Sequence, residues 1–329
     1  MVKYMNRRMS VLWSIITCVG LLFFVTNTIQ AQGLGDLDQL FSANAADVET
    51  LTKAYLNPLA TGFSTAINSG WVTKAKPTKK LGFSVQLRSG FTSIPSSAQA
   101  FDVNNLDLTG NYRIEGNTSY TINGDEKSGQ QLFPIVDGVE SPTPITMPKG
   151  IGYNVVPAPM LQANVGFIKD TELTARYIPV TNFGDFGDLS LTGIGIKHGL
   201  NQWLPGGKLL PIDISIMAAY TTLSLNADIN SNQSVETTTD GFVLNALVGK
   251  TLPFLSAYGG IGFQTGSFAL DIEQGGLLSE SISFTQDSDA AIHAIAGFQL
   301  KIAILRIYVE ATMAEYATVN AGIGIGLRN

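Results

Sequence analysis

Apolar side chains occupy every second position over the last forty or so residues of the chain. The runs 292–302, 305–313 and 319–327 each place aliphatic residues on one face and polar residues or glycine on the other. A spacing of two is typical of a β-strand, because successive side chains point to opposite faces of the strand. Runs of about ten residues with one apolar face match the length that crosses a bilayer at a tilt.

The same alternation recurs upstream, and the connections between the runs differ in length. Outer-membrane barrels have short periplasmic turns and longer external loops. The phase of the alternation slips near Thr222, which predicts a bulge there. Alternating runs lie at 81–88, 161–167, 173–177, 189–200, 210–220, 242–248 and 255–263; the long connections are 93–155, 227–238 and 271–289, and the short ones are 169–170, 201–208, 251–253 and 303–304.

These patterns predict an all-β fold, an antiparallel transmembrane β-barrel of about 10–14 strands. The pattern shows ten strands directly, and hairpins hidden in 93–155, most readily in 101–122, would add to them. The alternative is a secreted β-sandwich with the apolar face in its core. The length of the strands and the many Ala and Gly residues on the apolar face favour the barrel, because a sandwich core needs larger side chains.

The N-terminus has the pattern of a secretory signal. A basic stretch ending at Arg8 precedes the apolar residues 11–25, and Ala31 is a small residue suited to the cleavage point. We therefore expect a cleaved signal peptide at 1–31 and a bacterial outer-membrane location. A membrane-anchoring helix is the alternative, but the apolar stretch is short for a span.

The only cysteine, Cys18, lies inside the apolar part of this signal. Acylation of Cys18, as in a lipoprotein, is the alternative to simple cleavage. The residue before it, Thr17, is not the usual small residue, and the apolar run continues beyond Cys18. With the signal removed, the chain has no cysteine and forms no disulfide.

Residues 32–78 differ from the rest of the chain. The stretch 46–56 has helical character, with Val48, Leu51 and Tyr55 on one face, before Asn57-Pro58. We expect an N-terminal plug in the barrel lumen or a flexible periplasmic leader, followed by the barrel at 79–329.

Composition and charge exclude several classes of protein. Charged residues make up 14% of the chain, well below the roughly 25% of soluble domains. The chain is too apolar for disorder, and its net charge of −6 argues against nucleic acid as a partner.

The chain lacks the residue patterns of common active and metal sites. Neither His198 nor His293 has a metal-ligand spacing with another ligand residue, so no metal or cofactor is expected. Gly-x-Ser-x-Gly is absent. Ser190 and Thr192 share one strand face with His198, which is poor geometry for a triad. We expect no enzymatic activity.

The polar face of the predicted strands supplies the candidate site residues. Mixed charges inside a barrel are typical of internal ion pairs that lock the wall or a plug, and the Gly-Ile-Gly runs at 193–195 and 322–326 leave room there. Lys301 and Arg306 flank a short turn near the periplasmic mouth, where an ion-selectivity role is the alternative. The lumen-lining candidates are Arg88, Glu172, Arg176, Asp213, His293, Gln299, Lys301, Arg306 and Glu310, and the lipid-facing candidates are Phe298, Val309 and Ile323.

Two segments carry a resemblance to a known type of protein. The segment 193–212, which reads Gly-Ile-Gly-Ile-Lys-His-Gly-Leu-Asn-Gln-Trp-Leu-Pro-Gly-Gly-Lys-Leu-Leu-Pro-Ile, and the segment 171–179 resemble uncharacterised outer-membrane barrels of Bacteroidota-like bacteria. That family is similar in plan to outer-membrane fatty-acid and hydrocarbon channels, which carry an N-terminal hatch in the lumen. The resemblance implies a monomeric barrel in outer-membrane lipid, with a path for a hydrophobic small-molecule ligand.

The sequence therefore predicts an integral outer-membrane β-barrel that binds or passes small hydrophobic molecules, in the manner of a porin-like channel. The alternative is a structural or assembly barrel that binds a partner protein through its large loops, especially 93–155, without transport.

Overall fold

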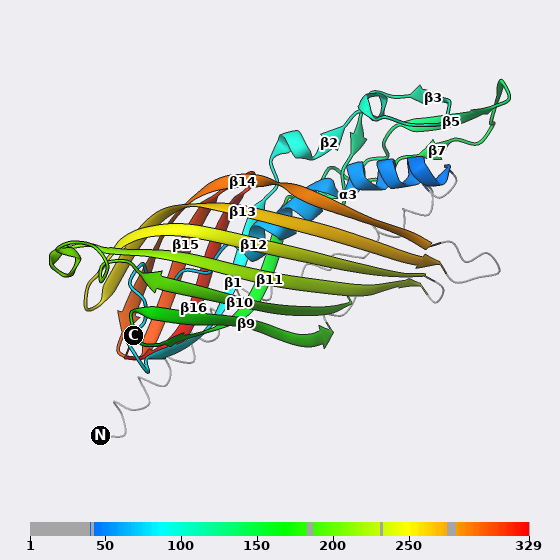
Figure 1. Ribbon diagram of the computed structural model, residues 1–329. Coiled ribbons are helices and arrows are strands. Elements are labelled where there is room, and N and C mark those ends of the chain that lie inside the picture. Colours follow the sequence, from blue (N-terminus) through cyan, green and yellow to red (C-terminus); the bar gives the residue numbers. More distant parts are fainter. Residues whose placement is uncertain (1–39, 41–42, 183–186, 231–232, 275–280, 329) are drawn as a thin grey trace, which may run out of the picture. The chain divides into compact units, whose positions relative to one another are not determined.

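The computed structural model describes residue 40 and residues 43–328, apart from 183–186, 231–232 and 275–280 (Figure 1). The predicted signal peptide, with Cys18 and the cleavage point, lies outside the described residues.

Ten antiparallel strands form a closed barrel (Figure 1). Each strand pairs with its neighbour in sequence, and β1 closes the barrel by pairing with both β8 and β16. This confirms the predicted all-β antiparallel barrel. The strands are β1 (Phe83–Ser93), β8 (Val155–Gly166), β9 (Thr171–Asn182), β10 (Asp188–Gly199), β11 (Asp213–Asn230), β12 (Gln233–Thr251), β13 (Leu255–Gln274), β14 (Ser281–Ile302), β15 (Leu305–Met313) and β16 (Ala317–Leu327).

The two ends of the barrel differ, and we call them the turn end and the loop end. The turn end carries the connections 167–170, 200–212, 252–254 and 303–304. The loop end carries the long segment 94–154, which joins β1 to β8. One predicted short turn was wrong: the connection around 201–208 runs from 200 to 212 and includes a 3-10 helix at Gly207–Leu209.

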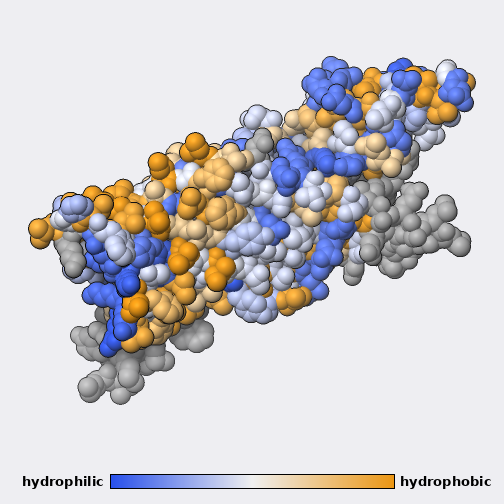
Figure 2. Space-filling view, in the orientation of Figure 1, coloured by the Kyte–Doolittle hydropathy of each residue, from blue (hydrophilic) through white to orange (hydrophobic). Residues whose placement is uncertain are grey.

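Over the half of the barrel nearer the turn end, the outward face is apolar and the inward face is polar. In β1, Phe83, Val85 and Leu87 are exposed, whereas Gln86 and Arg88 are buried in the interior. Figure 2 shows the hydrophobic residues gathered over this part of the wall. A belt of exposed apolar side chains around a polar interior is the pattern of a barrel that faces lipid.

Beyond this belt the two faces exchange polarity. Strands β11 to β14 are 18, 19, 20 and 22 residues long, about twice the length of a strand that only crosses a bilayer. In their parts nearest the loop end, Leu223, Val235 and Phe268 point inward and are buried, while Glu236 and Asp271 point outward and are exposed. The strands therefore continue as a water-facing sheet with an apolar inner surface.

This exchange corrects two predictions. The pairing of β11 with β10 runs without interruption from Ser215 to Asn226, so no bulge lies near Thr222. From Leu223 onward the apolar residues lie on the inward face instead of the outward face, and this change produced the same sequence pattern as a bulge. Most of the predicted loops at 227–238 and 271–289 is strand. Their outward residues are polar because they face water, which removes the alternation expected next to lipid.

The segment 94–154 forms an extension at the loop end, and none of its strands joins the barrel wall. Hairpins in this segment therefore add no strand to the barrel, which has the ten strands that the alternation shows directly. The six short strands pair among themselves as two small sheets: β2 (Ala100–Phe101) with β4 (Ser119–Tyr120), and β3 (Tyr112–Glu115), β5 (Gln131–Val136), β6 (Val139–Glu140) and β7 (Ile145–Thr146).

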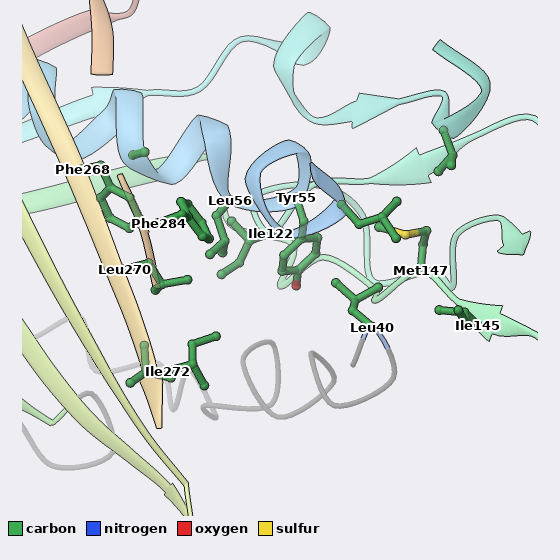
Figure 3. Close-up of a cluster of buried hydrophobic side chains, with 14 of the residues drawn as sticks. Leu40, Tyr55, Leu56, Ile122, Ile145, Met147, Phe268, Leu270, Ile272 and Phe284 are labelled. Atoms are coloured by element: carbon green, nitrogen blue, oxygen red, sulfur yellow. The ribbon is translucent and has the colours of Figure 1, made fainter. Parts of the chain in front are cut away.

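One long helix, α3 (Ala45–Asn68), links the extension to the barrel interior. The Asn44 side chain caps it by accepting a hydrogen bond from the Asp47 N–H. Around the first turns of α3, a hydrophobic core joins the helix residue Tyr55 to Ile122 and Met147 of the extension and to Phe268 and Phe284 of the long strands (Figure 3). The long strands thus serve as a platform for the extension. Among the described residues, no helix is long and apolar enough to cross a membrane.

Candidate functional site: the occupied lumen

The end of α3 and the segment that follows it fill the barrel interior. Ala66 and Ile67 of α3 pack against Met160 and Leu191 of the wall. Past the helix, Trp71, Val72 and Ala75 are buried against inward residues of four strands, Met217 of β11, Val243 and Leu247 of β12, Tyr258 of β13 and Ile295 of β14. We call residues 69–79 the lumen segment. It reaches the turn end, where Leu81 N–H donates to the Gly166 carbonyl.

The polar inner wall is built to hold the backbone of this segment. Arg176 donates through its two terminal nitrogens to the carbonyls of Ile67 and Ser69, at 2.7 and 2.8 Å, and its guanidinium lies over the ring of Trp71. Gln162 donates to the Trp71 carbonyl and also accepts from Arg176 Nε. Because these groups are buried, each satisfied carbonyl avoids the cost of an unpaired polar atom.

A second set of contacts comes from β1, β13 and β15. Glu310 accepts the Gly70 N–H at 2.6 Å and the Tyr258 hydroxyl at 2.7 Å. Arg88 donates to the Val72 carbonyl, whose oxygen also lies 3.0 Å from the Tyr258 hydroxyl oxygen. These contacts tie the wall to the segment where the helix has ended and its backbone groups need new partners.

Nearer the turn end, one buried ion pair joins this network. Lys197 Nζ lies 2.8 Å from Glu172, and both side chains are almost fully buried. Lys197 also donates to the Lys74 carbonyl, and Glu172 accepts the Thr78 N–H. Ser215 donates to the Ala75 carbonyl. In the described residues, wall side chains thus bind eight backbone groups between Ile67 and Thr78.

Glycines on the inward face make room for the segment. A Cβ on Gly195 would lie 3.0 Å from the Trp71 ring and one on Gly193 3.2 Å from it. A Cβ on Gly322 would lie 2.6 Å from Arg88 Cγ. The lumen-facing glycines of the two Gly-Ile-Gly runs therefore accept an indole and an arginine side chain.

The structure places the predicted site residues as follows. Arg88, Arg176 and Glu310 hold the lumen segment by its backbone, whereas the sequence had suggested ion pairs among them. Glu172 alone among the acidic candidates forms a buried ion pair within the described residues. His293 is buried and lies 2.7 Å from Asn245 Oδ1. Gln299 is also buried. Asp213, Lys301 and Arg306 lie at the turn end. The lipid-facing candidates lie on the outward face and are at least partly exposed: Phe298, Val309 and Ile323.

Two cavities border this filled interior. One, of about 250 Å³, lies between α3 and strands β13 and β14, and its lining is mostly polar, including Asn57, Ser64 and Gln286. The other, of about 520 Å³, opens at the turn end. Five basic residues line the second cavity: Lys74, Lys76, Lys79, Lys301 and Arg306.

Sequence reasoning missed the three lysines of the lumen segment. The signal was present, because four lysines fall within the seven residues 74–80, directly before β1. No group of three or more His, Cys, Asp or Glu residues suited to a metal ion occurs in the described part of the chain.

The comparisons with known proteins give the family and a general likeness of fold. Residues 8–327 match a family of unknown function, DUF6588. The chain belongs to this family. No curated protein matches this DUF6588 member.

Solved structures similar to this DUF6588 chain include outer-membrane proteins of three bacteria. The Ail attachment invasion locus protein of Yersinia pestis is 10% identical, with a TM-score of 0.28, over 75% of this chain and 99% of Ail. The translocator domain of the autotransporter NalP from Neisseria meningitidis is 11% identical, with a TM-score of 0.29, over 85% of this chain and 98% of the NalP domain. The outer membrane channel DcaP of Acinetobacter baumannii is 10% identical, with a TM-score of 0.21, over 78% of this chain and 99% of DcaP. Likenesses at this level carry no information on function.

Proposed function

We propose that the protein is an integral outer-membrane β-barrel whose lumen is closed and whose extension binds a partner protein at the cell surface. The observation that carries this proposal is the binding of eight backbone groups of the segment from Ile67 to Thr78 by the inner wall. A channel needs a lumen that is open or readily opened, whereas these buried contacts hold the segment in place.

The long strands support the same conclusion. β11 to β14 continue beyond the apolar belt and turn an apolar face toward α3 and the extension. A barrel that served only as a pore would have no need of this platform. Its effect is to fix a folded extension at the loop end, the end that we assign to the outside because it carries the longest connection.

The tip of the β5–β6 hairpin is the candidate contact. Val136 and Val139 flank the turn Asp137-Gly138 and are 67% and 71% exposed. The ion pair between Arg113 and Glu140 holds the base of the hairpin. Exposed apolar side chains on a braced hairpin are suited to a protein contact.

Passage of small hydrophobic molecules, as expected from the similarity in plan between the resembled barrel family and fatty-acid and hydrocarbon channels, is the weaker proposal. The apolar part of the interior is already filled by the lumen segment, and the cavity between α3 and the wall is lined mostly by amide, hydroxyl and carboxylate groups. A hydrocarbon ligand needs a largely apolar pocket.

Site-specific photo-crosslinking in cells tests the leading proposal. A crosslinker at Val139 should capture a discrete partner band that disappears in the variant Val136→Ser, which leaves the probe in place. A crosslinker at Leu209, which is 89% exposed at the turn end, is the matched control and should not give that band. Identical bands from both positions would contradict partner binding by the extension.

Liposome uptake distinguishes the second candidate. The closed barrel should show no uptake of a fatty acid or alkane above protein-free liposomes and should carry no bound lipid ligand in its lumen by native mass spectrometry. Uptake by the native chain that changes when residues 45–78 are deleted would support transport instead.

A further inference from the structure

The cavity at the turn end is lined by five basic side chains and no acidic one. Lys74, Lys76 and Lys79 come from the lumen segment, and Lys301 and Arg306 come from the β14–β15 hairpin. These two parts of the chain are far apart in sequence, so the fold itself brings the charges together. Like charges placed side by side repel one another unless an anion neutralises them.

Lys74 is the most informative of the five. Its side chain is only 2% exposed, yet it lines the cavity. Among the described residues, its ammonium makes no hydrogen bond or ion pair, whereas its carbonyl accepts from Lys197. Glu172 attracts this ammonium electrostatically but is not hydrogen-bonded to it, so a bound anion would supply its direct partner.

The nearby carboxylates are already engaged. Glu172 lies 2.8 Å from Lys197 Nζ and accepts the Thr78 N–H. Asp213 lies 3.4 Å from Lys76 Nζ and offsets one of the five charges. At least three positive charges of the cavity therefore remain unbalanced by neighbouring side chains.

The cavity is also rigid on its barrel side. Arg306 donates through its terminal nitrogens to the carbonyls of Ala303 and Gly326, which fixes the guanidinium at the mouth. The Lys301 backbone N–H donates to the Phe254 carbonyl and so joins the β12–β13 and β14–β15 hairpins. A preformed site loses little conformational freedom when a ligand binds.

We propose that this cavity binds a phosphate group. Several converging ammonium groups act as point charges that suit a multiply charged phosphate better than a single carboxylate. The volume of about 520 Å³ leaves room for an organic group attached to the phosphate. Leu252 and Pro253 line the cavity and the adjacent Phe254 is 64% exposed, so an apolar rim lies where a phospholipid acyl chain would emerge.

Two sources can supply this phosphate: the headgroup of an anionic phospholipid in the adjoining leaflet, or a soluble phosphate ester. The experiment uses the full chain in a neutral detergent and the double variant Lys79→Gln with Lys301→Gln. The control is Lys53→Gln with Lys127→Gln, which removes the same charge from α3 and the extension, far from the cavity. Circular dichroism and gel migration of the unheated barrel confirm that each variant is folded.

Titration with inorganic phosphate and with glycerol 3-phosphate measures the soluble source, and native mass spectrometry after reconstitution with phosphatidylglycerol or phosphatidylcholine measures the lipid source. We expect the double variant to bind at least about tenfold more weakly than the native chain and the control, with the difference shrinking at high salt. Retention of phosphatidylglycerol alone identifies the headgroup as the source, and saturable binding of the soluble phosphates without lipid retention identifies a soluble ester. Equal binding by the native chain, the control and the folded double variant in every arm would overturn the proposal.

Discussion

The guanidinium of Arg176 lies over the indole of Trp71, with its carbon 3.8 Å from the ring centroid, inside the barrel. The same guanidinium donates to the carbonyls of Ile67 and Ser69, just where α3 ends. One wall side chain thus holds both the backbone and the largest side chain of the lumen segment.

Replacing Arg176 by Gln should therefore loosen the lumen segment. Two buried carbonyls lose their donors, and each should cost about 1–3 kcal/mol of the free energy of unfolding. Urea unfolding in lipid vesicles, followed by tryptophan emission, measures the change. The control Arg113→Gln breaks two exposed ion pairs and should cost no more than about 1 kcal/mol for each. Equal losses in the two variants would contradict the role of Arg176.

A side chain at Gly195 should displace Trp71. Gly195→Val places new atoms against the indole, so we expect a loss of about 1–3 kcal/mol and a shift in tryptophan emission. Gly259→Val is the control, because the nearest atom to a Cβ at Gly259 is the Ile295 carbonyl oxygen at 3.5 Å. If both variants unfold at the native urea concentration, the close packing of Trp71 on the wall is wrong.

Removing one partner of the ion pair between Lys197 and Glu172 should cost more free energy of unfolding than removing both charges. Lys197→Met leaves a buried carboxylate without its cation and should cost about 3–5 kcal/mol. Adding Glu172→Gln should recover part of that loss, because the uncompensated charge is removed. A double variant whose loss is the sum of the two single losses would show that the pair is not coupled.

Acid should release the extension from α3. Burial raises the pKa of Asp47, but hydrogen bonds from Thr109, Tyr112 and Gly110 outweigh it and hold the pKa below its ordinary value of 3.8. The stabilisation is therefore present above about pH 4 and is lost as the pH falls through the lowered pKa of the folded state. Limited proteolysis of the extension should accelerate over that range. In Asp47→Asn, cleavage should already be fast at neutral pH, and a pH-independent cleavage rate in the native chain would contradict this link.

The exchange of faces along β12 predicts where lipid ends. Leu244 and Glu236 both point outward on this strand, eight residues apart. Leu244→Arg should destabilise the barrel in vesicles by about 2–4 kcal/mol, whereas Glu236→Arg should change stability by no more than about 1 kcal/mol. Comparable losses at the two sites would show that the apolar belt extends farther than the exposed side chains indicate.

The strands next to lipid could be predicted from the sequence, because there one face is consistently apolar. The same reasoning failed beyond Thr222, where Leu223 and Phe268 face inward and water replaces lipid outside. Alternation reports which face is apolar but not which medium surrounds the other face. Only the pairing of β11 with β12 and of β12 with β13 shows that the strands continue.

The residues of the candidate site were predictable only in part, and its contacts were not. Gln162, Lys197, Ser215 and Tyr258 also hold the lumen segment and were not among the candidates. The inward positions of Arg88, Arg176 and Glu310 follow from their place on the polar face. Their partners are backbone atoms of the lumen segment. The pattern of side chains in the sequence does not predict which carbonyl accepts a hydrogen bond from a given guanidinium. The basic cavity forms because the end of the lumen segment lies beside the β14–β15 hairpin. These two parts of the chain come together only when the barrel closes, so the sequence did not predict the cavity.

The path of the chain also sets an order for assembly. Ala45 begins α3 beside the extension at the loop end, whereas β1 begins at Phe83 at the turn end, so the chain passes through the interior of its own barrel. Trp71 packs too closely against Gly195 to move through the interior of a barrel that has already closed. We therefore expect the sheet to form around the lumen segment, with the pairing that closes the barrel made last.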